Sequence, residues 1–185
     1  MTWTLSDSGT STATLGQEST LATDTNNGTF VLEVDTSNMI AGDLLEIRCK
    51  TITLNGGSLV QAWKGTYQHT QINNHKISPP LAIDQEISCS IKQITGTVTL
   101  TTPPSSATSF ADGSTFYGQS SSGHGIVHVP GGGALSTTAG SAILQVYSSQ
   151  TLSSGETIVT LLSTTVTAVI GRPIGETYPW KILRI

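Results

Sequence analysis

The sequence predicts an all-β protein, an antiparallel β-sandwich of jelly-roll-like form with a β-rich insertion and an extended N-terminal arm. Three observations support this fold class. Apolar and polar residues alternate over several short runs, clusters of Gly, Asn, Pro and Ser separate these runs, and Ser and Thr occupy 53 of the 185 positions. Because Thr is favoured on the pleated surface of a sheet and no segment shows a clear helical pattern, we expect strands throughout.

The clearest strands lie in the stretch 28–54, GTFVLEVDTSNMIAGDLLEIRCKTITL. Phe30, Leu32 and Val34 occupy alternate positions, which predicts a half-buried strand. Turn-forming residues fill 35–43, and a second alternation begins at residue 45 and changes phase after residue 50. The change of phase predicts a β-bulge in this second strand.

Further segments extend the predicted sheets. Asn55-Gly56-Gly57 predicts a hairpin into a strand at 59–68, and residues 69–80 predict a loop with one short extended piece. Alternation over 87–92 predicts a fourth strand, which residues 98–100 could continue or follow with a fifth. The last segment, 177–185, predicts a terminal strand docked into the sheet, because leaving its large apolar side chains exposed would be unfavourable.

Eight apolar side chains on these strands are the expected anchors of the core or of an interface: Phe30, Leu32, Val34, Ile47, Trp63, Ile87, Ile91 and Trp180. Cys49 and Cys89 also fall at apolar positions of their strands. We favour buried free thiols for this pair, because synthesis in a cytoplasm keeps thiols reduced, and a disulfide is the alternative.

Changes of composition divide the chain into three parts. Residues 1–27 are polar with scattered Leu and predict an N-terminal arm, either disordered or lying across a neighbouring subunit. Residues 28–100 and 173–185 predict the sandwich core. Residues 101–172 predict an inserted β-rich excursion, since no Lys or Arg occurs between Gly96 and Gly171. In the alternative arrangement, the strands of this tract belong to the same sandwich.

Charge and hydropathy limit the class of partner. A net charge of -4 with eight Lys and Arg predicts no clustered basic face for a phosphate backbone, so we expect no nucleic acid partner. No apolar run approaches 18 residues, and the N-terminus has neither the basic nor the apolar region of a secretory signal. We therefore expect no membrane partner and a protein made in a cytoplasm.

The histidines do not form a convincing metal site. His124 and His128 have the i, i+4 spacing of metal-binding helices, but the flanking glycines and Pro130 predict a loop instead. An extended segment would place the two imidazoles about 13 Å apart. A folded loop or a symmetry axis could still bring imidazoles onto one ion. His69 and His75 have no acidic residue or cysteine nearby in sequence, so we expect no metal ligand among them.

Motifs for catalysis or cofactor binding are also absent from the sequence. There is no G-x-S-x-G motif to hold a nucleophilic Ser, and the glycines at 131–133 lack the Lys and Ser or Thr of a phosphate-binding loop. Glu33, Asp35, Asp43 and Glu46 fit solvent-facing strand or turn positions. We therefore expect no catalytic residues, no cofactor and no enzyme activity.

Five segments resemble a family of small tailed-phage proteins encoded among the virion structural genes: GTFVLEVDTSNMIAGDLLEIRCKTITLNGG, QAWKGTYQH, KISPPL, EISCSIKQITGT and YPWKILRI. In that family, one compact β-domain has a KQ-x-x-GT segment that runs almost directly into an aromatic-Pro-Trp closing strand. Here about eighty residues separate the two. The likeness covers residues 27–97 and 177–185, and it implies that the tract between them is an insertion.

Members of this family look like capsid decoration or cement components. The resemblance therefore implies a non-enzymatic virion protein on the capsid exterior, whose partner is the major capsid protein. Homo-oligomers, for example trimers, would suit binding at the symmetry junctions of a shell. The alternative is a receptor- or glycan-binding module of a tail or fibre, in which loops around residues 117–128 contact the host surface. A hydrolase is the least supported hypothesis.

Overall fold

The computed structural model describes residues 2–40, 42–102, 104, 106, 110–120, 123–129, 132–134, 140–146, 157–160, 163–170 and 176–185. Their regular elements are all strands, which confirms the all-β prediction. In chain order, the strands are β1 (Thr4–Ala13), β2 (Glu18–Asp24), β3 (Gly28–Asp35), β4 (Leu44–Thr51), β5 (Val60–Gln68), β6 (His75–Ile77), β7 (Leu81–Ile83), β8 (Ile87–Thr102), β9 (Thr115–Gly118), β10 (His124–His128), β11 (Gly140–Val146), β12 (Thr157–Thr160), β13 (Ser163–Ile170) and β14 (Glu176–Arg184).

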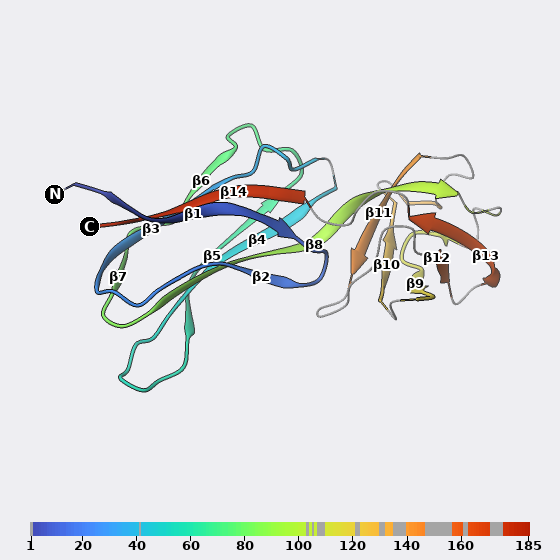
Figure 1. Ribbon diagram of the computed structural model, residues 1–185. Helices are drawn as coiled ribbons and strands as arrows, with labels where there is room; N and C mark the ends of the chain where they lie inside the picture. The colour runs from blue at the N-terminus through green and yellow to red at the C-terminus, as the bar shows by residue number, and fades with distance from the viewer. Residues whose placement is uncertain are drawn as a thin grey trace.

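The molecule has two lobes that share the long strand β8 (Figure 1). A sandwich of two sheets lies on the left of the view, and both chain termini lie at its far end. From the sandwich, β8 continues into a second lobe on the right. The second lobe therefore projects from the end of the sandwich that is opposite the termini.

Two antiparallel sheets form the sandwich. Sheet A has the strand order β1-β14-β3-β6, and β7 pairs with the other half of β3. Sheet B, within the sandwich, has the order β2-β8-β4-β5. The predicted antiparallel β-sandwich is thereby confirmed, whereas the jelly-roll likeness stays a prediction. The predicted closing strand at the C-terminus is β14, which lies between β1 and β3.

Alternation of apolar residues builds the core between the sheets. In β4, every second residue is buried without a break, and the strand ends at Thr51, before the change of phase. The register with β5 does shift between Cys49 and Lys50, but the extra residue, Ala62, lies on β5, so the bulge predicted in β4 is wrong. Each large apolar side chain that moves from water into this core contributes about 1.5–3 kcal/mol. The core cluster takes residues from both sheets: Ala13, Leu21, Ala22, Phe30, Leu32, Val34, Met39, Leu45, Ile47, Cys49, Ile83, Ile87, Cys89, Ile91, Tyr178 and Ile182.

The N-terminal segment is extended, as predicted, but it is not an arm that leaves the domain. Strand β1 pairs with β14 from Thr4 to Ala13, and β2 pairs with β8 from Glu18 to Asp24. Ala13, Leu21 and Ala22 are buried in the shared core. The two proposed states of an arm, disordered or lying across a neighbour, are therefore wrong for the residues of β1 and β2.

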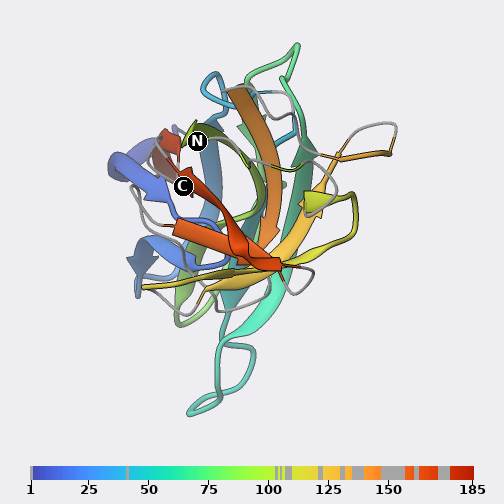
Figure 2. The same ribbon diagram turned by 90° about the vertical axis from the view of Figure 1, so that its right-hand side faces the viewer.

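The second lobe is a closed ring of six antiparallel strands. The C-terminal half of β8 pairs with β11, and the pairing continues through β10, β9, β12 and β13 back to β8. Figure 2 shows this lobe in front of the sandwich. Its described interior contains Phe110, Phe116, Val127 and Ile158, all fully buried and separate from the sandwich cluster.

The boundaries of the predicted insertion differ in detail from the observed lobe. The predicted boundary at residue 100 falls inside β8, because one strand of 16 residues serves both lobes. The boundary at residue 173 lies outside the described residues. The segment 124–128 was predicted to be a loop and is instead strand β10, whose glycine at 125 faces the interior of the ring.

Candidate functional site

The predicted anchors lie in or against the sandwich core. Six of them, Phe30, Leu32, Val34, Ile47, Ile87 and Ile91, are at most 1% exposed. The two tryptophans, Trp63 and Trp180, are partly buried and pack against the core cluster. The indole of Trp180 lies over Gly9 of β1, where an added Cβ would be 3.0 Å from the ring. The tryptophans are thus packing residues rather than an exposed aromatic platform.

Cys49 and Cys89 face each other across β4 and β8. Their Sγ atoms are 3.0 Å apart, both side chains are fully buried, and both thiols are free, as the sequence favoured. The hydrogen bond with Cys49, together with burial, raises the pKa of the Cys89 thiol far above its usual value. This pair therefore fills core volume and has none of the features of a reactive nucleophile.

The histidines are distributed over separate sites. His124 stacks against Tyr117 with ring centroids 5.9 Å apart, and His128 Nδ1 lies 3.5 Å from Asp112 Oδ1. His69 Nδ1 accepts a hydrogen bond from a backbone N–H, that of Gly42, at 3.0 Å. Among the described residues, no group of three His, Cys, Asp or Glu side chains could hold a metal ion.

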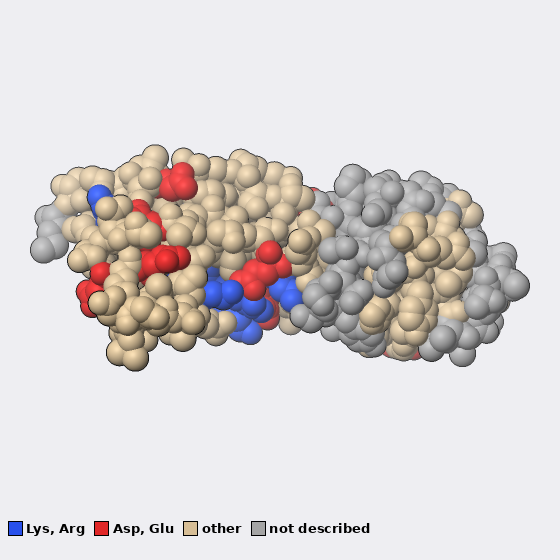
Figure 3. All heavy atoms as spheres, turned by 60° about the horizontal axis from the view of Figure 1, so that its bottom comes forward, with Lys and Arg blue, Asp and Glu red and all other residues tan. Residues whose placement is uncertain are grey.

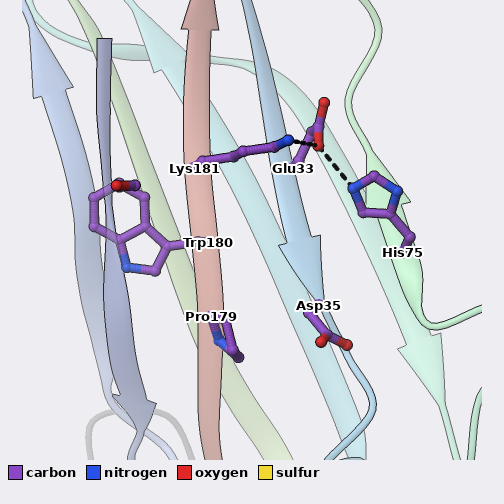
Figure 4. A pocket seen from close by; sticks show the side chains of 7 residues that line it. Glu33, Asp35, His75, Pro179, Trp180 and Lys181 are labelled. Atoms are coloured by element: carbon purple, nitrogen blue, oxygen red, sulfur yellow. Dashed lines mark hydrogen bonds and ion pairs between the residues drawn. The ribbon is translucent and has the colours of Figure 1, made fainter. Parts of the chain in front are cut away.

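A shallow pocket of about 260 Å³ lies on sheet A, and it is lined by Ser8, Glu33, Asp35, His75, Pro179, Trp180 and Lys181. Figure 4 shows Lys181 and His75 pointing at the carboxylate of Glu33, while Trp180 points the other way, towards β1. Lys181 Nζ lies 2.8 Å and His75 Nε2 2.7 Å from Glu33 Oε2. One carboxylate oxygen is therefore shared by two cationic or donor groups.

This pocket lacks the geometry of an acid–base or nucleophilic centre. Partial burial acts to raise the pKa of Glu33, but hydrogen bonds from Lys181 and His75 and their charges outweigh it and lower the pKa below 4.5. Glu33 is therefore ionised at neutral pH, and it is not a general acid. Ser8 on β1 is three strand spacings from His75 on β6, about 14 Å, so the two cannot form a Ser–His pair.

A second candidate surface is the outer face of sheet B, which gathers charged side chains from four adjacent strands. We call it the charged face, and its members are Glu18, Glu46, Arg48, Lys50, Lys64 and Lys92. Figure 3 shows Lys, Arg, Asp and Glu concentrated over the sandwich in this view. The face holds four of the eight Lys and Arg of the chain but two of its twelve Asp and Glu. The cations are therefore more clustered than the composition indicated, although two carboxylates lie among them.

Ion pairs connect the members of the charged face. Glu18 accepts from Arg48 at 3.1 Å and from Lys50 at 2.7 Å, and Glu46 pairs with Arg48 and, at 3.1 Å, with Lys64. Lys92 lies directly opposite both carboxylate residues in the strand register. The two carboxylates thus hold the longer cationic side chains in place across the strands.

The protonation of the two carboxylates follows from these contacts. Partial burial acts to raise the pKa of Glu18, but hydrogen bonds from Lys50 and Ser90 and the charges of Lys50 and Arg48 lower it overall. For Glu46, the same opposition between burial and the Arg48 and Lys64 contacts also gives a lowered pKa. Both carboxylates are ionised at neutral pH, so the face carries a formal excess of two positive charges.

Sequence reasoning missed the charged face because Glu18, which pairs with Arg48 and Lys50, lies in the N-terminal segment. The alternation of Glu46, Arg48 and Lys50 does predict a charged outer side for one strand. Glu18, however, reaches them only because β2 pairs with β8, and the polar composition of residues 1–27 gives no sign of that pairing.

Comparison with known proteins adds no further constraint. No protein-family model, curated protein or solved structure matches this chain. Within the described part of the chain, no helix has the length and apolar character to cross a membrane.

Proposed function

We propose that this chain is a non-enzymatic structural protein of a tailed-phage virion, a capsid decoration or cement protein that binds the major capsid protein and stabilises the shell. The distribution of exposed apolar side chains carries the proposal. Among residues with described burial, every large apolar side chain that is at least 36% exposed belongs to the sandwich: Trp3, Leu5, Leu54, Leu59, Val60, Ile72, Ile77 and Ile185. Three of them, Leu54, Leu59 and Val60, gather on the hairpin between β4 and β5, and clustered apolar groups of this kind mark protein-binding surfaces.

The position of the segments that resemble the phage family supports the same proposal. Of residues 27–97 and 177–185, all but the last few before residue 97 fold together in the sandwich, although about eighty residues separate the two segments in sequence. The second lobe leaves between β8 and β14, where the family pattern has a short connection. A domain that attaches, with an added lobe that projects, fits a protein on the exterior of a shell.

A protein of this kind stabilises the shell because it attaches at many equivalent sites. Each contact can be modest, because copies bound around a symmetry junction each connect neighbouring capsid subunits and act together. A homo-oligomer would add contacts between copies. No deep pocket or reactive group is required for this role.

Binding to capsids that lack the protein tests the proposal. Purified protein is mixed with such capsids, and the bound fraction is measured by co-sedimentation. We expect saturable binding with hundreds of copies per particle and a higher temperature of capsid disruption. Failure to associate at micromolar concentration would reject the proposal.

A receptor- or glycan-binding appendage is the second candidate, and one observation favours it. Tyr117 and His124 form a cross-strand ring pair on the outer side of the second lobe, where aromatic rings could stack on a sugar. Densitometry of purified virions separates the two functions, since a tail module would be present in a few copies. Binding to host cells or to a glycan array, lost on Tyr117→Ala, would support this candidate.

A further inference from the structure

We infer that the charged face of sheet B and the β4–β5 hairpin form one docking surface, and that it fits an acidic protein surface with an apolar depression beside it. This inference rests on the proposed function, because it names the surface by which the sandwich would bind the shell. Two independent observations carry it, the charge of the face and the apolar character of the hairpin.

The most exposed charges of the face are positive. The side chains of Lys64 and Lys50 are 40% and 32% exposed, whereas that of Glu46 is 14% exposed. Glu18 is 29% exposed, about as much as Lys50, but both carboxylates are already paired with cations, so the charge left over on the face is positive. The chain as a whole has a net charge of -4, so this face is a local reversal of its charge. An acidic partner surface is the complement.

The hairpin that joins β4 and β5 is uncharged, has exposed apolar side chains on both sides of its turn, and projects from the sandwich. It forms the loop at the bottom of Figures 1 and 2, below the sheets. No charged residue occurs in residues 51–60, and Leu54, Leu59 and Val60 are 74%, 36% and 47% exposed. Gly56 at the tip has a φ of 75°, which permits the tight turn. An apolar tip of this shape gains stability by entering a depression on a partner.

The face and the hairpin are continuous because both belong to β4 and β5. Arg48 and Lys50 lie in β4 and Lys64 in β5, and the same strands lead directly into the hairpin. A single partner surface could therefore contact both. Charged residues would set the orientation and the rate of binding, while the apolar tip would add affinity.

A protein partner fits this surface better than a nucleic acid. A phosphate backbone would pass over Glu18 and Glu46, which lie among the cations and repel phosphates. The aromatic residues of β5, Trp63 and Tyr67, pack against the core and leave no stacking platform for bases or sugars. An acidic protein surface can instead place its carboxylates between those of the face.

Three double variants of the full chain test the inference on capsids that lack the protein. K50Q/K64Q removes two cations from the charged face, and L54N/L59N makes the hairpin tip polar. K76Q/K181Q is the matched control, because it removes the same charge from two lysines of sheet A. Binding is measured at 50 mM and 300 mM NaCl, and tryptophan fluorescence verifies that each variant is folded.

We expect K50Q/K64Q to bind at least tenfold more weakly than wild type at 50 mM NaCl and to lose most of the salt dependence. L54N/L59N should also bind at least tenfold more weakly but keep the salt dependence. K76Q/K181Q should stay within twofold of wild type. If K50Q/K64Q or L54N/L59N binds as well as the control, the inference is overturned.

A surface coated with poly-L-glutamate provides a second measurement that does not involve capsids. Wild type and K76Q/K181Q should bind it at 50 mM NaCl, and K50Q/K64Q should bind at least fivefold less. Equal binding by the two lysine variants would overturn the inference. Absence of wild-type binding to capsids would reject the proposed function instead, and the poly-L-glutamate result would then decide the inference alone.

Discussion

Truncation of Ile182 measures how firmly the C-terminal strand closes the sandwich. Ile182 is fully buried in β14, opposite Leu32 of β3 in the strand register. Ile182→Ala removes three carbon atoms, which costs about 2.4 kcal/mol at about 0.8 kcal/mol per methylene. The cavity left behind raises the expected loss of unfolding free energy to about 3–4 kcal/mol.

Leu54→Ala is the matched control, because it removes the same number of carbon atoms from a side chain that is 74% exposed. We expect it to cost less than about 0.5 kcal/mol. Urea unfolding followed by tryptophan fluorescence measures both values. The signal reports on the sandwich, since Trp3, Trp63 and Trp180 are the three tryptophans of the chain and all belong to that lobe.

The urea m-value should be the same for both variants and wild type, which shows that the same surface is exposed on unfolding. A loss below about 1 kcal/mol for Ile182→Ala, or a loss equal to that of Leu54→Ala, would refute the reasoning. Either result would mean that β14 does not complete the core between sheet A and sheet B.

Two other predictions concern the charged face and the core thiols. Because the folded-state pKa values of Glu18 and Glu46 are lowered from 4.5, their contacts stabilise the fold above pH 4.5, and this stabilisation is lost as the pH falls through the folded values. E18Q/E46Q should therefore show a smaller fall in unfolding free energy below pH 4.5 than wild type, and the difference should be about 1 kcal/mol or less. An identical pH profile for the variant and wild type would contradict the ion pairs of the charged face. Cys49 and Cys89 should be inert to a thiol reagent in the native protein and should both react in urea, whereas rapid native labelling would show that the core is open.

Local alternation predicted the centre of the sandwich, because the two-residue period directly reflects one buried side of a strand. Phe30, Leu32 and Val34 point inward in β3, and Ile47 and Cys49 do so in β4. The closing strand could also be predicted, since its large apolar side chains must be buried somewhere in the fold.

The edge strands and the short strands could not be predicted in the same way. Seven of the ten residues of β1, from Thr4 to Thr10, are exposed, so this strand exists through backbone pairing with β14 rather than through an apolar pattern. In β9 and β10, the inward positions include Gly118 and Gly125, which remove the apolar signal from strands of four and five residues. The closed ring of the second lobe depends on backbone pairing between such strands, and the amino-acid composition does not predict it.

For the candidate site, the sequence identified charged outer positions on single strands. It did not predict that these strands lie side by side and bring the charges together on one face. Glu46, Arg48 and Lys50 were predicted to face solvent, and they do. Their connection to Glu18 depends on a strand that the polar N-terminal segment did not reveal. Surfaces that span several strands are determined by strand order, which local patterns do not contain.

A three-dimensional reconstruction of decorated particles tests the central proposal most directly. The two lobes differ in position relative to both termini, so density at a resolution that separates the lobes gives the orientation of each copy. The account predicts many symmetry-related copies with the charged face and the β4–β5 hairpin of the sandwich against the shell and the second lobe to one side of the sandwich (Figure 3). Density confined to the tail, or a second lobe lying against the shell with the sandwich outward, would contradict it.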